Sequence, residues 1–97
     1  MNKAFTVIFI FFLKLSLFSQ LFTVKGKILD SNDDEPLIGA TVKINYKNLG
    51  TTTNFDGDFQ FENIQNGDYF LTVSYIGYQN KIIEIKVNSN LVIIPNI

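Results

Sequence analysis

Hydrophobic and polar residues alternate along most of the chain after residue 20. The clearest run spans residues 40–47 and places Ala40, Val42, Ile44 and Tyr46 on one side. A period of two is typical of a β-strand with one buried face and one solvated face. Pro36 and Gly39 precede this run, and we interpret them as the turn that leads the chain into its central strand.

The same alternation predicts six further strands, at 22–29, 51–53, 59–64, 68–75, 82–87 and 91–94. No stretch after residue 20 combines helical spacing with capping residues. Seven short strands separated by turn residues predict an all-β, seven-stranded β-sandwich. We expect this sandwich to occupy residues 20–97 as one domain and to follow an N-terminal signal-peptide helix.

Two dipeptides and one glycine refine this expectation. Asp56-Gly57 and Asn66-Gly67 are both hairpin-type signals, because Asn, Asp and Gly tolerate positive φ. Gly26 falls on the inward side of the first strand, where a missing side chain predicts a bulge or a close neighbour. The lysines on the outer side of that strand are expected to limit random pairing at a sheet edge.

The first nineteen residues have a different composition. Met1-Asn2-Lys3 is a short basic start, and residues 4–13 are almost wholly apolar. This arrangement is typical of a secretory signal peptide, which we expect to be cleaved after Ser19. A retained membrane anchor is the alternative, but it would place Lys14 near its middle, at a cost of about 2.5–3.5 kcal/mol. Either reading takes the chain out of the cytoplasm.

Composition excludes several classes of function. The chain contains no cysteine, which excludes disulfides and thiol nucleophiles, and no histidine. Without either residue, the common catalytic triads and structural zinc sites are excluded as well. Residues 20–97 contain six lysines and nine carboxylates, which gives this part of the chain a net charge of about −3. This balance speaks against nucleic acid as a partner.

The remaining polar groups do not predict a catalytic, cofactor-binding or metal-binding site. Aligning Gly57 with the invariant glycine of a calcium-binding EF-hand loop puts Thr52 and Asn63 where acidic ligands are required. A tight turn is therefore the better interpretation of Asn54–Gly57. The acidic loop Asp33-Asp34-Glu35 has the oxygen ligands for a weak Ca²⁺ site, but a solvated loop is favoured. Paired-carboxylate hydrolysis needs two acids in a cleft, which this pattern does not predict.

Two aromatic residues are candidates for a contact surface. The alternation predicts an inward position for Phe59, Phe61, Tyr69 and Tyr75. Phe70 is predicted to face outward and Phe55 to lie in a turn. Exposed aromatic side chains are common in contact surfaces, so this pair is a candidate for one.

Three groups of residues together resemble the carboxypeptidase-regulatory-like domain. They are Pro36-Leu37-x-Gly39-Ala40-x-Val42, Gly50-Thr51-x-Thr53-x-x-x-Gly57-x-Phe59 and Gly67-x-Tyr69-x-Leu71-x-Val73-Ser74-x-x-Gly77-Tyr78. The resemblance runs from Val24 to Val87 and implies a transthyretin-like Greek-key sandwich. Asn54 stands where the family usually has aspartate.

The family is best known as the periplasmic N-terminal extension of TonB-dependent outer-membrane receptors in Gram-negative bacteria. The resemblance therefore implies a non-catalytic module of, or fragment from, such a receptor, exported and associated with the periplasm or outer membrane. Its expected partners are outer-membrane or periplasmic proteins that dock at a sheet edge, with no cofactor. The alternative is a standalone exported domain that binds a ligand such as a glycan. Because the chain stops at Ile97, we expect either a truncated receptor gene or a short family member.

Overall fold

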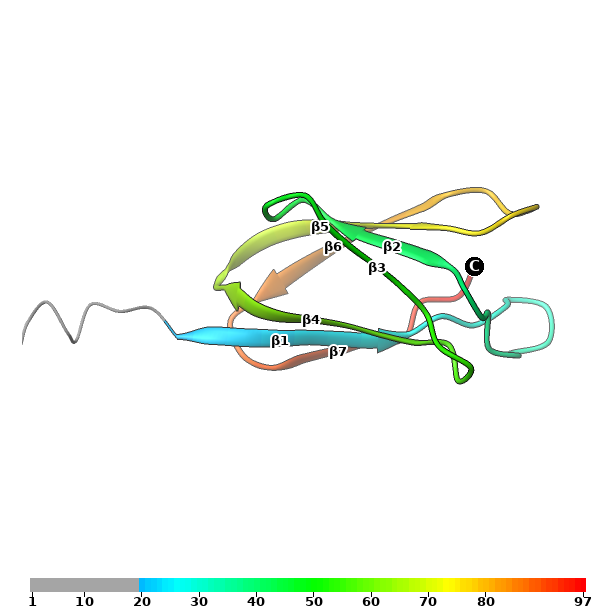
Figure 1. The fold of residues 1–97 in the computed structure, drawn as a ribbon, viewed down its shortest axis with the longest axis horizontal. Coiled ribbons are helices and arrows are strands. Elements are labelled where there is room, and N and C mark those ends of the chain that lie inside the picture. The colour runs from blue at the N-terminus through cyan, green and yellow to red at the C-terminus, as the bar shows by residue number, and fades with distance from the viewer. Residues whose placement is uncertain (1–19) are drawn as a thin grey trace, which may run out of the picture.

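The computed structural model describes residues 20–97 (Figure 1). The predicted signal peptide, its helix and the cleavage site after Ser19 lie outside the described residues. Residues 20–97 contain no helix long and apolar enough to cross a membrane.

Seven strands form two sheets that face each other across the core (Figure 1). The strands are β1 (Leu21–Lys27), β2 (Thr41–Ile44), β3 (Leu49–Thr52), β4 (Asp58–Gln65), β5 (Gly67–Ser74), β6 (Lys81–Val87) and β7 (Leu91–Ile93). One sheet has the order β4-β1-β7 and the other β3-β2-β5-β6. The predicted all-β sandwich is confirmed.

The connections explain how the chain builds both layers. β2–β3 and β5–β6 are antiparallel hairpins within the four-stranded sheet, whereas the connections after β1, β3, β4 and β6 cross to the other sheet. Such crossings are the rule in Greek-key sandwiches. β7 pairs with β1 in parallel, and β4 pairs with β1 in antiparallel fashion.

The core consists of the inward residues of both sheets. Its buried members are Val24, Ile28, Leu37, Ala40, Val42, Ile44, Phe59, Phe61, Ile64, Leu71, Val73, Ile85 and Val87. The predicted inward face of residues 40–46 is confirmed, since Ala40, Val42 and Ile44 are buried and Tyr46 is half-buried. Because period two fixes which face each side chain takes, the alternation predicted this core except for Leu37, which lies in the segment before β2.

Several predicted boundaries are wrong by one to three residues. The central strand ends at Ile44, because Asn45–Asn48 form a turn in which Lys47 and Asn48 have φ of 54° and 53°. β3 consequently begins at Leu49, two residues before the predicted Thr51. Two successive residues at positive φ suit the twist of a hairpin, which a strand continuing to Tyr46 would not allow.

Neither Asp56-Gly57 nor Asn66-Gly67 joins two strands of one sheet. Each dipeptide connects a strand of one sheet to a strand of the other, and Gly67 is already the first residue of β5. The tight turn at Asn54–Gly57 is confirmed, with the Gly57 N–H donating to the Asn54 carbonyl at 2.9 Å. Local turn chemistry predicted the reversals but not which layer the chain enters next.

The first strand is central and not an edge. β1 lies between β4 and β7. The expectation that its lysines limit random pairing at a free sheet edge is therefore wrong. Gly26 is buried, and a Cβ there would lie 2.1 Å from the Ile93 carbonyl oxygen and 2.8 Å from the Phe59 ring. The predicted close neighbour of Gly26 is therefore confirmed, while the irregularity of register lies between Phe22 and Val24.

Candidate functional site

Phe70 is the aromatic side chain that the outer face of the four-stranded sheet presents to solvent. It lies in β5 and is 45% exposed, which confirms its predicted outward position. Two backbone-directed contacts hold it against the end of β2. The Phe70 N–H donates to Asn45 Oδ1 at 2.9 Å, and the Phe70 carbonyl accepts from the Asn45 N–H at 3.2 Å.

An open hollow lies on each side of Phe70. The hollow toward β2 and β3 has a volume of about 300 Å³ and is lined by Lys43, Ile44, Asn45, Asn48, Leu49, Phe70 and Thr72. The hollow toward β6 has a volume of about 530 Å³ and is lined by Asp68, Tyr69, Phe70, Glu84, Ile85 and Lys86. Amide and lysine groups beside an exposed ring can hold a polar ligand with one apolar face.

Phe55 does not join this surface. It is 84% exposed, at the turn between β3 and β4, and none of the hollows described in residues 20–97 contains both phenylalanines. Asn54 builds the turn, because its Oδ1 accepts the N–H groups of Asp56 at 3.0 Å and Asp58 at 2.9 Å. The two aromatic residues are exposed as predicted, but they lie at separate places.

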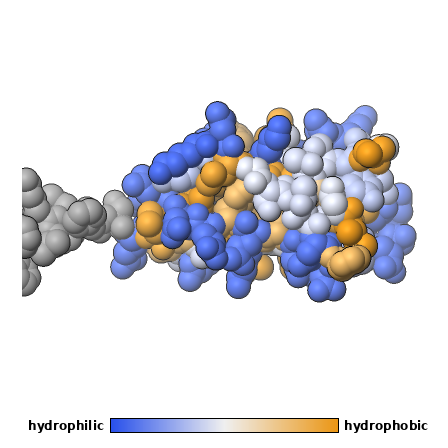
Figure 2. Space-filling model, viewed as in Figure 1, coloured by the Kyte–Doolittle hydropathy of each residue, from blue (hydrophilic) through white to orange (hydrophobic). Residues whose placement is uncertain are grey.

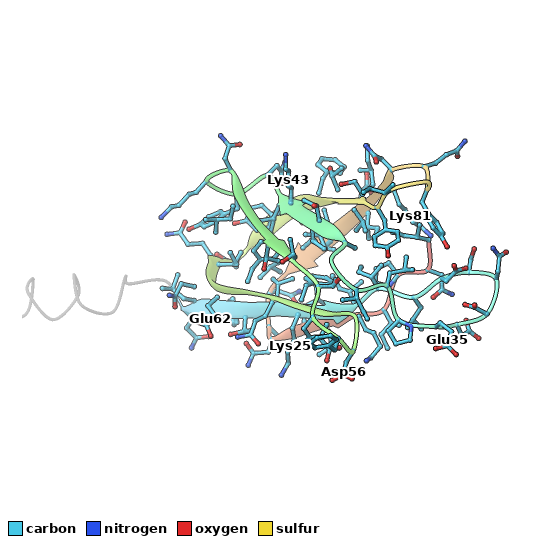
Figure 3. The ribbon with its side chains drawn as sticks, turned by 45° about the vertical axis from the view of Figure 1, so that its right-hand side comes forward. Lys25, Glu35, Lys43, Asp56, Glu62 and Lys81 are labelled. Atoms are coloured by element: carbon cyan, nitrogen blue, oxygen red, sulfur yellow. The ribbon has the colours of Figure 1, made fainter. Side chains whose placement is uncertain are left out.

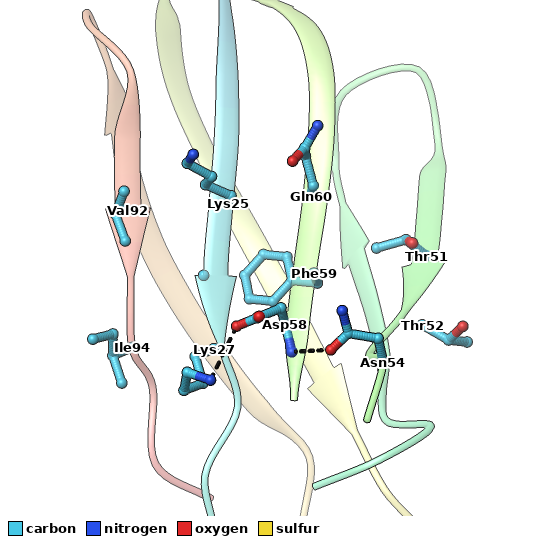
Figure 4. Close-up of a pocket in the computed structure, with 11 residues that line it drawn as sticks. Lys25, Lys27, Thr51, Thr52, Asn54, Asp58, Phe59, Gln60, Val92 and Ile94 are labelled. Carbon is cyan, nitrogen blue, oxygen red and sulfur yellow. Dashed lines mark hydrogen bonds and ion pairs between the residues drawn. The ribbon is translucent and has the colours of Figure 1, made fainter. Parts of the chain in front are cut away.

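A third hollow crosses the outer face of the three-stranded sheet (Figure 4). Its volume is about 530 Å³, and it is lined by Lys25, Gly26, Lys27, Thr51, Thr52, Asn54, Asp58, Phe59, Gln60, Val92 and Ile94. Lys27 Nζ lies 3.2 Å from Asp58 Oδ1 and also donates to the Asp56 carbonyl at 2.7 Å. Asp58 is the single carboxylate in this lining and is already paired, so the hollow lacks the two acids that glycoside hydrolysis requires.

The acidic loop is solvated, and its side chains are used for turns. Asp33, Asp34 and Glu35 are exposed, and Asp33 Oδ1 accepts the Glu35 N–H at 3.0 Å. Among residues 20–97, no three acidic, histidine or cysteine side chains converge in a way that could hold a metal ion. Figure 3 shows Glu35 at the far end of the sandwich from Glu62, pointing away from the sheets.

One polar contact was missed by the sequence reasoning. The Tyr78 hydroxyl donates a short hydrogen bond to Asp30 Oδ2, and Asp30 Oδ1 accepts the Asn32 N–H at 2.7 Å. The Tyr78 hydrogen bond, and then that of Asn32, lowers the pKa of Asp30, while the same contact raises the pKa of Tyr78. Nothing in the alternation pairs a loop aspartate with a tyrosine 48 residues away.

The other aromatic residues are structural. Phe59 and Phe61 are buried, and Tyr69 and Tyr75 are half-buried, as predicted. Tyr69 packs edge-on against Tyr46 with 5.3 Å between ring centroids, and Tyr75 packs similarly against Tyr78. Edge-to-face pairs of this kind stabilise a core beyond the area they bury.

The fold and these surfaces together define a class: a small transthyretin-like β-sandwich module with open, shallow surface hollows. A sequence profile of the CarboxypepD_reg-like domain matches residues 24–97, and the chain belongs to that family. This confirms the resemblance noted in the sequence.

One curated relative places the family match in a larger protein. The chain is 40% identical over 82 residues to the TonB-dependent receptor SusC of Bacteroides thetaiotaomicron. The aligned region covers 84% of this chain but 8% of that receptor, so the chain spans a small part of its relative's length.

Solved structures share the fold at low identity. The 5-hydroxyisourate hydrolase of Klebsiella pneumoniae has a TM-score of 0.56 and 21% identity, covering 82% of this chain and 91% of that one. A DUF3823 family protein from Bacteroides ovatus has a TM-score of 0.59 and 20% identity, covering 77% and 42%. The major pilin subunit BcpA of Bacillus cereus has a TM-score of 0.58 and 15% identity, covering 79% and 30%. These likenesses concern the sandwich alone.

Proposed function

We propose that this domain is a non-catalytic interaction module of a TonB-dependent outer-membrane receptor, exported and exposed to the periplasm. The observation that carries the proposal is the 40% identity to a receptor of that class over 84% of this chain. Two observations support a role without chemistry: the acidic loop Asp33–Glu35 is exposed, and the hollow on the three-stranded sheet has a single carboxylate, Asp58, which is paired with Lys27.

The free edge of β6 is the docking surface that we propose. β6 is the outer strand of the four-stranded sheet and has seven residues without proline or glycine. At the other open edge, β7 has only three residues, and Pro95 stands two residues after its end. The remaining outer strands, β3 and β4, contact each other. A strand edge carries unpaired N–H and C=O groups, so an extended segment of a partner can add to it.

A domain exchange in the related receptor tests the receptor role. The matching region of that receptor is deleted, or is replaced by the corresponding residues of this chain, and receptor-dependent uptake is measured. We expect deletion to abolish uptake and replacement to restore it. Normal uptake after deletion, or no recovery with a folded, correctly inserted chimera, would overturn the proposal.

Two neighbouring proline substitutions test the edge. Successive N–H groups of an edge strand point alternately toward its neighbour and into solvent. Of Ile82→Pro and Ile83→Pro, one therefore removes a ladder bond to β5 and one removes only an outward donor. We expect the variant that keeps the parental melting temperature to lose uptake in the chimera. If that variant transports normally, β6 is not the docking edge.

The hollows beside Phe70 support a second candidate, an exported domain that binds a glycan. An exposed ring flanked by Asn45, Asn48 and Lys43 offers a stacking face and hydrogen-bonding groups to a sugar. Calorimetric titration with cellohexaose and mannohexaose tests it, with Phe70→Ala as the variant and Phe55→Ala as the matched control. Binding that is lost in Phe70→Ala alone would support this candidate, and heat signals that neither variant changes would count against it.

A further inference from the structure

The outer face of β6 carries one acid and one base that have no charged partner. On this face the strand presents Ile82, Glu84 and Lys86, and all three are exposed. The ion pair that the structure shows within residues 20–97 joins Lys27 to Asp58, so neither charge of β6 is paired there. The edge strand therefore offers a free carboxylate and a free ammonium group two residues apart on one face.

Open space lies beside both charges. The hollow of about 530 Å³ between β5 and β6 is lined by Glu84 and Lys86 together with the exposed ring of Phe70. On the β5 side, Phe70 lies opposite Glu84, and Asp68 lies opposite Lys86. On the other side, β6 has no neighbouring strand in the described part of the chain. A strand added there would place its own side chains next to both charges.

The pattern of this edge defines the strand that fits it. In an antiparallel pair, opposite charges that face each other stabilise the contact and like charges destabilise it. A matching strand therefore has a base opposite Glu84, an acid opposite Lys86 and an apolar residue opposite Ile85. An antiparallel second copy of β6 meets all three conditions when the two Ile85 residues face each other. Glu84 of each copy then faces Lys86 of the other, and Ile83 faces Val87.

The neighbouring registers are disfavoured by the same rule. A pair centred on Glu84 or on Lys86 sets identical charges opposite each other at the two-fold axis. A pair centred on Ile83 sets Lys81 opposite the buried Ile85 on the inner face. A slip of one residue turns the apolar inner face outward. The register centred on Ile85 is thus the one that the sequence of β6 favours.

We propose that the β6 edge binds a second copy of this chain, which joins the two four-stranded sheets into one across a two-fold axis. The proposal goes beyond the receptor role and rests on the open β6 edge, on which the docking of a partner strand also depends. The two occupants exclude each other, so the dimer covers the edge while no partner is bound. Because a single pair of edge strands forms a small contact, we expect a reversible dimer with a dissociation constant on the order of 100 µM.

Two charge reversals test the dimer by complementation. Glu84→Lys and Lys86→Glu each turn both attractive pairs of the dimer into repulsive pairs, so we expect the dissociation constant of each variant alone to rise about tenfold or more. In an equimolar mixture, the two lysines of one variant face the two glutamates of the other. We expect this mixture to form a mixed dimer with a dissociation constant close to that of the parent.

Sedimentation equilibrium of the chain purified after export measures the association. Glu62→Lys is the matched control, because it changes the net charge as Glu84→Lys does but lies on β4, and we expect it to associate like the parent. Lys86→Glu also faces Asp68 within the same chain, so the melting temperature of each variant is measured alongside. If Lys86→Glu does not fold, the comparison of Glu84→Lys with Glu62→Lys decides the question.

Three results would overturn the dimer. They are a parent chain that stays monomeric at about 1 mM, a Glu84→Lys variant that associates as tightly as the parent, and a mixture of the folded variants that associates no better than either alone. Receptor-dependent uptake separates this failure from that of the docking role. A monomeric parent whose stable β6 proline variant loses uptake would reject the dimer and keep the docking edge. A dimeric parent whose proline variant transports normally would reject the docking edge alone.

Discussion

Thr53 and Ala40 are joined by two hydrogen bonds, one from the backbone and one from a buried hydroxyl. The Thr53 N–H donates to the Ala40 carbonyl at 2.9 Å, and the Ala40 N–H donates to Thr53 Oγ1 at 2.8 Å. The same hydroxyl donates to the Leu37 carbonyl at 2.6 Å. Thr53, the residue directly after β3, therefore holds the Pro36–Gly39 turn in place through these hydrogen bonds.

Replacing Thr53 by valine keeps the shape of the side chain and removes the hydroxyl. The Ala40 N–H and the Leu37 carbonyl then lose their partner inside the core, so we expect the free energy of unfolding to fall by about 2–3 kcal/mol. Thr53→Ser is the matched control, because it retains the hydroxyl and should lose clearly less. Urea unfolding of both variants measures the difference, and equal losses would mean that the methyl group matters more than the hydrogen bonds.

Gly39 is required for its backbone conformation and not for space. Its φ is +78°, and a Cβ there would meet no atom within 4 Å. We expect Gly39→Val to lower the free energy of unfolding by more than about 1 kcal/mol, and Gly39→Asn to cost less, because Asn tolerates positive φ better. Gly50→Ala is the control, since Gly50 is not at positive φ and its nearest atom is 3.6 Å away. An unchanged melting curve for Gly39→Val would show that the turn adapts.

Gly26 shows the opposite case, in which space is decisive. A Cβ at Gly26 would lie 2.1 Å from a backbone oxygen, which cannot move without shifting β7. We expect Gly26→Ala to lower the free energy of unfolding by about 3 kcal/mol or more. Chemical denaturation measures this loss, and a loss below about 1 kcal/mol would show that β7 moves easily.

The Asp30–Tyr78 hydrogen bond predicts a dependence of stability on pH. Because the contact lowers the pKa of Asp30, its contribution is present above the ordinary aspartate pKa of 3.8 and is lost as the pH falls through the folded-state value. Because it raises the pKa of Tyr78, the contribution is present below pH 10.0 and is lost as the pH rises through the folded-state value.

Tyr78→Phe removes both effects. We expect the parent to be more stable than this variant at neutral pH, and the difference in urea midpoint to shrink at about pH 3 and again above about pH 10. Tyr75→Phe is the control, because it removes a hydroxyl from the partner ring of the same aromatic pair. A difference that stays constant across this range would mean that the hydrogen bond does not couple to ionisation.

Several large hydrophobic side chains, among them Phe55, Phe70 and Ile82, are exposed on the outside of the sandwich. Figure 2 shows hydrophobic side chains among hydrophilic ones on the face in view. Ile82 is 67% exposed on β6, opposite Thr72 on the adjacent β5. The alternation predicted the outward position of Phe70, since one face of β5 has to face the core. The turn signal at Asp56-Gly57 predicted the exposure of Phe55, but exposure alone does not bring two aromatic rings together.

The sequence by itself determined the class of fold, the seven strands and nearly all of the buried face. These follow from local rules: period two selects the inward side chains, and glycine, asparagine and aspartate mark where the chain reverses. The family motifs are likewise local patterns, spread from Pro36 to Tyr78.

Only the tertiary structure decided which strands are neighbours. It placed β1 between β4 and β7, sent the turns after β3 and β4 across to the other sheet, and brought Tyr78 to Asp30 and Thr53 to Ala40. These pairings depend on how two whole sheets pack and twist against each other. The hydrogen-bonding capacity of a strand edge is the same for many partners, so no local pattern specifies which one it meets.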